Sequence, residues 1–511
     1  MQNIARYLAL LAAGACASSL VHAAQPSASA AVDPAAVAAF IDREVPELLR
    51  HSWVPGATVS VVQGDRVVFT KGYGIADVAT GERVDGARTL FRVGSITKTM
   101  TTAAALVLYE RGELNLDADI NRYLTTVTMP ARFPEPVTAR RLMTHHGGFD
   151  TNLENLTMPT DAQTILSPEA RQRAFVRVRP VSAPIIYDNL GFGVLGTVVA
   201  DIAKTTYREA MRRLIFGPLN MKTAVIGLPT DRLADAASCH RPDSRGRPTV
   251  CPQELIADIT QGGGDASVTA ADMAQFMRML LIPGKLLQPA TLAMMKDTDA
   301  QRLHPLLPGS GLGIREADYA GRRTVGHHGT IGGFVSEFAL FPQTRLGVFI
   351  SVNGDEAPAG PRMASTFYGA GVATGAIDAR PLVEEFVSRF ADAFVPPGAG
   401  SPVIGDAPLR ASERGEAHEM PAAELAGDYS RPDATIVKTR NNSAAIVHVG
   451  LTAGGLDAYG CAPFVRRAAM YYECRPAFGP VITQGFTRDA AGRVLLGHIA
   501  IEALERTPSK P

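Results

Sequence analysis

The stretch Phe91-Arg92-Val93-Gly94-Ser95-Ile96-Thr97-Lys98 marks the point at which the chain changes from a strand-like to a helical pattern. Beyond it, apolar residues recur on one helical face until a glycine typical of a helix end: Met100, Ala103, Ala104, Val107, Leu108, and then Gly112. Residues three apart on a helix lie on the same side, with Cβ atoms about 5–6 Å apart, so Lys98 can reach the Ser95 hydroxyl. A serine hydroxyl needs such a base or cation beside it to become a useful nucleophile. The stretch therefore predicts a reactive serine at the beginning of a helix.

The same spacing has a plainer interpretation. In it, Ser95 or Thr97 is an ordinary N-cap residue and Lys98 is a solvated side chain. The free backbone N–H groups at a helix N-terminus favour developing negative charge, which suits a nucleophile. Spacing alone leaves both interpretations open.

Outward from this stretch, residues 35–378 alternate strand-like and helix-like segments. The pattern predicts a hairpin over residues 57–69 with a Gly-Asp turn, and a pair of strands at 334–341 and 346–352. It predicts further helices at 192–204 and 270–282.

A change in composition follows. Residues 379–420 combine a helix near 381–394 with a Pro/Gly-rich linker that opens at Val395. Residues 421–511 have strand-and-turn texture and predict a small β domain.

Composition limits the class of protein. The 511 residues include 50 Lys+Arg and 50 Asp+Glu, for a formal net charge of zero. A nucleic-acid binder needs a basic surface that releases counterions from phosphates, so we expect no nucleic-acid partner. With 46% hydrophobic and 20% charged residues, the composition is that of a folded protein. At about 150 residues per domain, the length predicts two or three domains.

The N-terminus has the layout of a secretory signal peptide. Arg6 is followed by an apolar or small run from Leu8 to Val21, and Val21-His22-Ala23 offers small residues at the cleavage positions. The run is short for a membrane span of about 20 residues. A lipoprotein anchored at Cys16 is disfavoured, because Ala13 stands where a leucine is usual. We expect residues 1–23 to be removed and the protein to be periplasmic or secreted.

Export makes disulfides plausible for the remaining cysteines. Cleavage leaves Cys239, Cys251, Cys461 and Cys474, and four cysteines allow three pairings. We favour the two local pairs, Cys239–Cys251 and Cys461–Cys474, because each closes a short loop.

Two later segments complete a pattern with Ser95 and Lys98. Tyr187-Asp188-Asn189 follows an extended stretch, and Gly326-His327-His328-Gly329-Thr330 leads into a strand. Together with Arg141-Leu142-Met143-Thr144-His145-His146-Gly147-Gly148 and Gly262-Gly263, these segments appear in the order typical of one family. The chain resembles the serine β-lactamase and penicillin-binding protein superfamily, specifically its class C β-lactamase, DD-carboxypeptidase and family VIII esterase branch. The resemblance covers residues 35–378.

The resemblance implies an α/β (α+β) fold of the beta-lactamase/transpeptidase type. An antiparallel sheet is flanked by helices, with a helical subdomain forming the other wall of the cleft. Some relatives carry a lipocalin-like β domain at the C-terminus, and residues 421–511 are similar in size and texture.

The resemblance also implies roles for individual residues. Ser95 is the acyl-accepting nucleophile, Lys98 its activating partner and Tyr187 the residue that relays the proton to the leaving group. Which of Lys98 and Tyr187 takes the Ser95 proton stays open. The residues implied to contact the substrate are Asn189, His327, Gly329 and Thr330, with Asn189 orienting either the substrate amide or Lys98. The backbone N–H groups of Ser95 and Thr330 form the implied oxyanion hole.

Three residues depart from the family pattern, one of them His328, which is bulky where Thr, Ser or Gly is common. Asp188 replaces the usual serine and either places a carboxylate near the site or points into solvent. His327 replaces a lysine of many relatives, so the charge available for a substrate carboxylate depends on pH.

The implied function is an exported serine hydrolase that acts through an acyl-enzyme on a β-lactam, a D-Ala-D-Ala-type peptide or a related acyl substrate. A carboxylesterase or D-amino-acid peptidase is the main alternative, and an inactive penicillin-binding protein is disfavoured by intact Ser95, Lys98 and Tyr187. The expected partner is a small-molecule or peptide substrate, with no membrane span.

We expect no cofactor and no metal. The pairs His145-His146 and His327-His328 invite a zinc interpretation, but no carboxylate or thiol accompanies them at ligand spacing. His145 is interpreted as part of a structural loop, and the Gly262-Gly263-Gly264 run as a tight turn beside the site.

Overall fold

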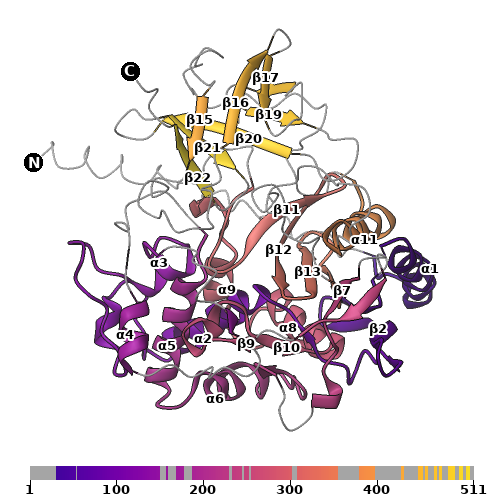
Figure 1. Cartoon of the computed structure of the whole chain (residues 1–511), viewed down its shortest axis with the longest axis horizontal. Helices are drawn as coiled ribbons and strands as arrows, with labels where there is room; N and C mark the ends of the chain where they lie inside the picture. The colour runs from indigo at the N-terminus through magenta and orange to yellow at the C-terminus, as the bar shows by residue number, and fades with distance from the viewer. Residues whose placement is uncertain are drawn as a thin grey trace, which may run out of the picture. The chain divides into compact units, whose positions relative to one another are not determined.

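The computed structural model describes most of the chain between residues 30 and 397 and the strands of the C-terminal region (Figure 1). The described ranges are 30–52, 54–149, 157–158, 168–175, 177, 187–228, 233–243, 247–252, 255–301, 308–354 and 379–397, followed by the C-terminal strands given below. The expected signal peptide, residues 1–23, lies outside these ranges, as does Cys461.

A seven-stranded antiparallel sheet forms the centre of the fold, in the order β11-β12-β13-β14-β1-β2-β3. The first strand of this sheet along the chain, β1, pairs with the last, β14, and Ala57 lies opposite Val352. The strands are β1 (Gly56–Gln63), β2 (Arg66–Asp77), β3 (Glu82–Arg83), β11 (Arg315–Tyr319), β12 (Arg322–Ile331), β13 (Phe334–Phe341) and β14 (Leu346–Val352). All seven residues of β14 are buried, as expected for a strand covered on both faces.

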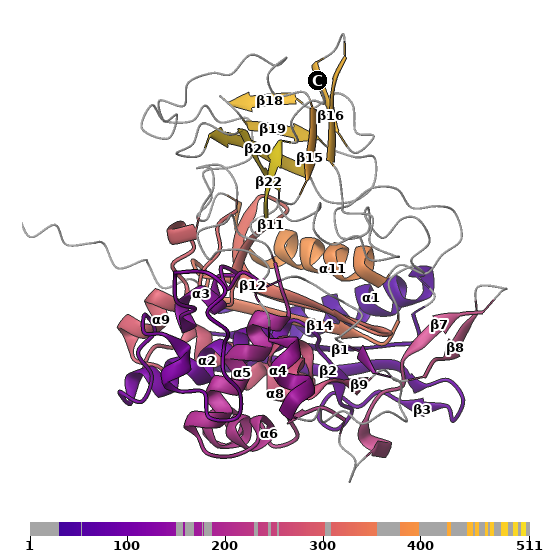
Figure 2. The same cartoon turned by 60° about the vertical axis from the view of Figure 1, so that its left-hand side comes forward.

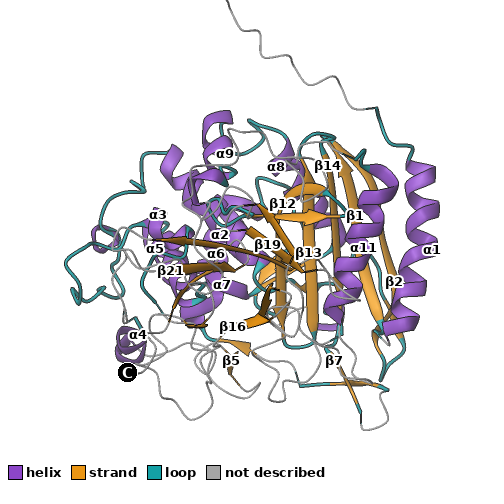
Figure 3. Ribbon diagram, turned by 90° about the horizontal axis from the view of Figure 1, so that it is seen from above, coloured by secondary structure: helices purple, strands orange, loops and turns teal. Residues whose placement is uncertain are grey.

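Two terminal helices cover one face of this sheet. Helix α1 (Pro34–Ser52) and helix α11 (Ala379–Phe394) lie alongside each other over the strands (Figure 3). Their apolar stripes pack against alternate residues of β13, such as Val335 and Ala339, in one cluster. The amphipathic pattern of each helix therefore has its partner in the sheet.

The opposite face carries the larger hydrophobic core. Residues Phe338 and Leu340 of β13 point into it, as the two-residue period of a strand requires. Helices α2 and α5 lie side by side in this part of the molecule (Figure 2). The helices longer than three residues here are α2 (Ile96–Glu110), α3 (Ala139–Met143), α4 (Pro168–Ala174), α5 (Leu190–Ile202), α6 (Tyr207–Met211), α7 (Gln261–Gly264), α8 (Ala270–Leu281) and α9 (Pro289–Met295), with a π-helical turn at Arg212–Phe216.

The elements expected from sequence periodicity are confirmed. The hairpin forms as β1 and β2, with β2 running eight residues past the expected end to Asp77. The paired strands form as β13 and β14, and the helices form as α2, α5, α8 and α11, with ends that differ by three residues or fewer. Helix α2 ends before Gly112, which adopts φ +72°, the left-handed conformation that favours glycine at a helix end.

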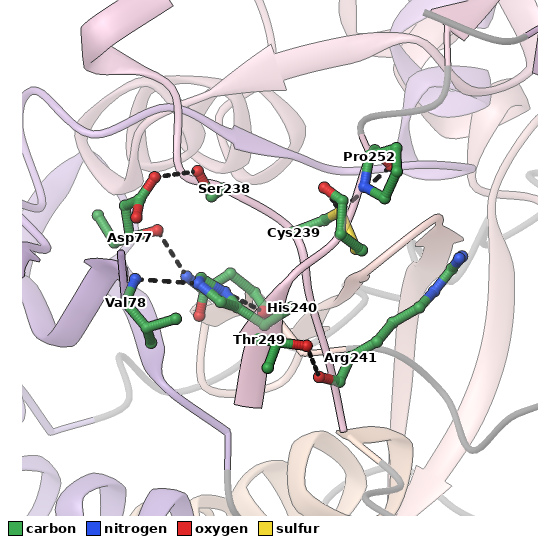
Figure 4. The surroundings of a disulfide bond; sticks show 11 residues. Asp77, Val78, Ser238, Cys239, His240, Arg241, Thr249 and Pro252 are labelled. Carbon is green, nitrogen blue, oxygen red and sulfur yellow. Dashed lines mark hydrogen bonds between the residues drawn. A yellow bond between two sulfur atoms is a disulfide. The ribbon is translucent and has the colours of Figure 1, made fainter. Parts of the chain in front are cut away.

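Smaller sheets complete the first part of the chain. Strand β10 (Ala266–Val268) joins β4 (Phe91–Arg92) to β6 (Val225–Ile226), β5 (Thr157–Met158) pairs with β9 (Leu255–Ile256), and β7 (His240–Pro242) pairs with β8 (Pro248–Val250). A disulfide closes the β7–β8 hairpin between Cys239 and Cys251, which confirms that pairing (Figure 4).

The disulfide neighbourhood is anchored to the central sheet. His240 accepts a hydrogen bond from the backbone N–H of Val78 and donates one to the carbonyl of Asn353 at 3.0 Å. Ser238 donates to Asp77 at 2.6 Å, as Figure 4 shows. These hydrogen bonds therefore attach the segment that carries the disulfide to the central sheet.

The described residues of the C-terminal region form an eight-stranded antiparallel sheet in the order β17-β16-β15-β22-β21-β20-β19-β18. Its strands are β15 (Gly427–Ser430), β16 (Val447–Thr452), β17 (Gly455–Ala458), β18 (Val465–Ala468), β19 (Tyr471–Cys474), β20 (Ile482–Arg488), β21 (Val494–His498) and β22 (Glu502–Arg506). The first strand pairs with the last, Tyr429 opposite Arg506. Cys474 ends β19, and its pairing with Cys461 stays a prediction.

In the part of the chain that the structure describes, no helix combines the length and apolar character needed to cross a membrane.

Candidate active site

Ser95 stands at the N-cap position of α2, but it does not cap the helix. Its hydroxyl makes no capping hydrogen bond. Thr97 donates instead to the carbonyl of Gly94 at 2.7 Å and accepts from the N–H of Ala266 at 2.9 Å, which fixes the entry of the helix. Lys98 is fully buried rather than solvated. Both parts of the plainer interpretation are therefore wrong.

Three acceptors surround the Lys98 amine. Nζ lies 3.0 Å from Ser95 Oγ, 2.5 Å from Asn189 Oδ1 and 2.6 Å from the carbonyl oxygen of Gly263. Removal from water lowers the pKa of Lys98 to about 7, although the Asp188 carboxylate opposes this shift. The amine is therefore divided between its charged and neutral forms near neutral pH.

The short helix α7 supplies one of these acceptors. The glycine run expected to form a turn beside the site forms a single helical turn, and it presents the Gly263 carbonyl to Lys98. A Cβ at Gly262 would come within 2.3 Å of the Phe192 carbonyl, so only glycine lets α7 lie this close to α5.

Tyr187 and Asn189 directly precede α5. The Tyr187 side chain is buried, and its ring centroid lies 4.8 Å from Lys98 Nζ. Burial raises the pKa of Tyr187 to about 12, while its hydrogen bond with Ser95 and the charge of Arg315 act in the opposite direction. The phenol therefore keeps its proton in the resting site and contacts the serine directly.

The edge of β12 lies against the beginning of α2. Gly94 adopts φ +50°, and a Cβ there would lie 2.7 Å from Thr330 N. A Cβ on Gly329 would lie 1.9 Å from the Val93 carbonyl oxygen and 2.8 Å from Ser95 N. The two glycines let the backbones of Ser95 and Thr330 approach each other, as an oxyanion hole made from these residues requires.

His327 is buried on β12, with its ring centroid 6.5 Å from that of Tyr187. Its Nδ1 donates to the carbonyl of His328 at 2.5 Å. Burial and the nearby cations Arg315 and Lys98 hold its pKa well below the usual value. His327 is therefore neutral near pH 7 and offers Nε2 as an acceptor rather than a positive charge.

Asp188 does not point into solvent. Its side chain is 1% exposed and accepts a hydrogen bond from the N–H of Gly191 in the first turn of α5. A negative charge is stabilised at a helix N-terminus, which explains why this carboxylate can be buried. His145, expected in a structural loop, lies next to Asp188 and packs at a tilt against Tyr187 with ring centroids 4.4 Å apart.

Arg315 was missed by the sequence reasoning. Arg315 is buried on β11, opposite Gly326 of β12. Gly326 is the residue that directly precedes His327. The positive charge of Arg315 lowers the pKa of Lys98, Tyr187 and His327. No motif marks this arginine, and only a predicted β11–β12 hairpin with the right register could have placed it.

The residues named from the sequence come together in one place. Hydrogen bonds link four of them: Ser95, Lys98, Tyr187 and Asn189. The other three lie on the adjacent strand β12: His327, Gly329 and Thr330. Within the described ranges, no group of three or more His, Cys, Asp or Glu side chains is arranged to hold a metal ion.

The chain is similar in sequence to known proteins. A family model described as Beta-lactamase matches residues 41–370. A beta-lactamase of Lysobacter lactamgenus is 28% identical over 258 residues, which cover 50% of this chain and 62% of that enzyme. The D-alanyl-D-alanine-carboxypeptidase/endopeptidase AmpH of Escherichia coli is 25% identical over 369 residues, which cover 67% of this chain and 90% of AmpH.

The similarity in fold covers more of the chain than the similarity in sequence. The crystal structure of SurE has a TM-score of 0.61 at 22% identity, and the match covers 93% of this chain and 99% of SurE. The central antiparallel sheet flanked by helices is that of the beta-lactamase/transpeptidase fold. With its family model matched over most of the first 370 residues, the chain belongs to the beta-lactamase family of hydrolases.

Proposed function

We propose that this protein is a serine hydrolase that forms an acyl-enzyme at Ser95, with Lys98 as the base for acylation. The observation that carries the proposal is the arrangement around Lys98 Nζ. A neutral amine has two N–H donors, and the two shorter contacts, to Asn189 and Gly263, take both. The lone pair then faces the Ser95 hydroxyl at 3.0 Å. This is the geometry of a general base.

The sequence left open whether Lys98 or Tyr187 takes the proton of Ser95. With a pKa of about 7, Lys98 can accept a proton at neutral pH. Tyr187, with a pKa of about 12, is protonated there and suits donation to the leaving group. We therefore assign acylation to Lys98 and the proton relay to Tyr187.

The remaining roles follow from position. As Ser95 Oγ attacks a carbonyl carbon, the negative charge on the carbonyl oxygen is stabilised by the N–H groups of Ser95 and Thr330, which Gly94 and Gly329 allow to approach. Asn189 holds Lys98 through its Oδ1, and its amide is assigned to orienting the substrate. Water then hydrolyses the ester on Ser95 and restores the hydroxyl.

The proposed substrate is a β-lactam or a D-Ala-D-Ala-type peptide. The name of AmpH, a D-alanyl-D-alanine-carboxypeptidase, supports the peptide class. The positive charge of Arg315, which acts on Lys98 and His327, favours a negatively charged substrate. A carboxylesterase or D-amino-acid peptidase is the second candidate. It is favoured by the neutral His327, which lacks the permanent charge of a lysine at that position.

Intact-mass analysis tests the proposal. The protein is incubated separately with a penicillin, a D-Ala-D-Ala peptide and a p-nitrophenyl ester. We expect a mass increase of one acyl group in the wild type and none in Ser95→Ala. Ser60→Ala is the matched control, because it removes a buried hydroxyl that has no hydrogen-bond partner among the described residues. An adduct that persists in Ser95→Ala would refute the proposal.

The same panel separates the substrate classes. A stable penicilloyl adduct without turnover would favour the peptidase, and rapid ester turnover without an accumulated adduct would favour the esterase.

We also propose export and a lipocalin-like C-terminal domain. The N-terminal layout supports export, which N-terminal sequencing of the mature protein from a periplasmic extract tests. The pairing of each C-terminal strand with its neighbours, with β15 next to β22, supports the domain assignment. Truncation near residue 400 should leave a folded catalytic domain if residues 379–420 end in a linker.

A further inference from the structure

A buried pair, Asp188 and His145, lies directly behind the phenol of Tyr187. His145 is 6% exposed and Asp188 is 1% exposed. The backbone N–H of Asp188 donates to His145 Nδ1 at 3.2 Å. The His145 ring packs at a tilt against Tyr187, with centroids 4.4 Å apart, and against Phe192, with centroids 5.1 Å apart. The imidazole thus joins the segment before α5 to the ring that contacts Ser95.

The backbone of His145 has an unusual conformation. His145 adopts φ +59°, which is uncommon for a residue with a side chain. Burial lowers the pKa of His145, so the ring is neutral and Nδ1 is free to accept from the Asp188 N–H. Strained backbone conformations cluster at functional sites, so the conformation of His145 suggests a functional role.

The carboxylate of Asp188 is only partly satisfied. One oxygen accepts from the N–H of Gly191, while Oδ2 has no hydrogen-bond donor among the described residues and lies 3.7 Å from His145 Nδ1. A buried carboxylate oxygen without a donor costs stability. This carboxylate is also the negative charge that acts on both Lys98 and Tyr187.

We propose that Asp188 and His145 are positioning residues for catalysis. His145 holds the Tyr187 phenol against Ser95 through its ring contact, and Asp188, buried one residue before the Asn189 that binds Lys98, keeps a negative charge beside the Lys98 amine. The inference rests on the proposed roles of Ser95, Lys98 and Tyr187. It assigns to the pair a part in the reaction rather than in the loop structure alone.

Few charged or titratable groups surround the Lys98 amine and can influence its pKa. The charged and titratable groups that face it are Asp188 and Tyr187 before α5, His145 after α3, Arg315 on β11 and His327 on β12. Asp188 is the acidic member and Arg315 the permanent cation. Replacing Asp188 with a neutral residue removes the carboxylate that raises the pKa of Lys98, so the amine should lose its proton at lower pH.

The test is the pH profile of Ser95 labelling by a fluorophosphonate, measured as a second-order rate constant. Asp188→Asn keeps an oxygen for the Gly191 N–H and removes the charge. We expect its midpoint to move down by about one pH unit, the lower part of the range for a neighbouring charge. Asp201→Asn is the matched control, because Asp201 lies at the other end of α5 and also accepts backbone N–H groups, from Thr125 and Thr126.

His145→Asn gives a second, independent measurement. Asparagine tolerates the left-handed backbone but has no ring to pack against Tyr187. We expect the plateau rate to fall about tenfold or more, with the midpoint unchanged, because the replaced imidazole is neutral. A purely structural role would lower thermal stability and leave both the plateau and the midpoint of the folded fraction at their wild-type values.

The outcomes separate the two proposals. If the wild-type protein is not labelled at Ser95, the proposed function and this inference both fail. If it is labelled and Asp188→Asn keeps the wild-type midpoint, only the role of the pair is overturned. Should Asp188→Asn not fold, Asp188→Ser repeats the removal of charge, since a serine hydroxyl can accept the same N–H. Failure of both to fold would assign Asp188 to folding and overturn the inference.

Discussion

The burial of Lys98 predicts a particular pH dependence for acylation. With a pKa of about 7, the neutral amine is about one tenth of the total at pH 6 and about nine tenths at pH 8. If neutral Lys98 takes the proton of Ser95, the acylation rate constant should rise about tenfold between these values and level off above pH 8. A lysine with its ordinary pKa would instead give a rate that keeps rising to about pH 10.

The measurement is the second-order rate constant for p-nitrophenyl ester acylation by stopped-flow absorbance from pH 5.5 to pH 9.5. The uncatalysed hydrolysis is subtracted by means of Ser95→Ala. A profile that is flat over this range, or that rises without a plateau, would refute the assignment of Lys98 as the base.

Arg315 allows the sign to be checked. Its positive charge lowers the pKa of Lys98, so Arg315→Gln should move the midpoint to higher pH. This direction is opposite to the one expected for Asp188→Asn. A downward shift in Arg315→Gln would show that its effect on the site is not electrostatic.

Two further predictions concern the supporting backbone. Gly329→Ala should lower Ser95 labelling by about 10²–10³-fold, because its Cβ would meet the Val93 carbonyl and Ser95 N and displace an oxyanion donor; labelling at the wild-type rate would contradict this. The double variant Cys239→Ser/Cys251→Ser should lose about 3 kcal/mol of unfolding free energy in urea, as expected for opening a loop of this length. An unchanged midpoint of unfolding would show that the disulfide does not constrain the unfolded chain.

Local patterns predicted several of the main helices and strands, whereas the family resemblance implied their architecture. The strands β1, β2, β13 and β14 and the helices α2, α5 and α8 follow from apolar periodicity, which depends only on neighbouring residues. The contact between Ser95 and Lys98 was also predictable, because it is made within one helical turn. Tyr187, Asn189 and His327 lie far along the chain, and only the family resemblance linked them to Ser95.

The charge state of the site was not predictable from the sequence. The neutral His327, the buried Asp188 and the nearby Arg315 depend on which groups lose contact with water when the sheet and helices assemble. Desolvation is a property of the folded chain, so residue types and spacing carry no direct signal for it.

The fully buried Lys98 also has a consequence for folding. Its pKa falls from 10.5 in the unfolded chain to about 7 in the folded protein. Between these values the unfolded state binds more protons, so this residue makes the fold more stable as pH rises from about 7 to about 10.5. At and below neutral pH it opposes folding by up to about 5 kcal/mol, a large fraction of the stability of an ordinary domain. Lys98→Met should remove this pH dependence of stability together with the activity, and it leaves Asn189 Oδ1 and the Gly263 carbonyl without their donor.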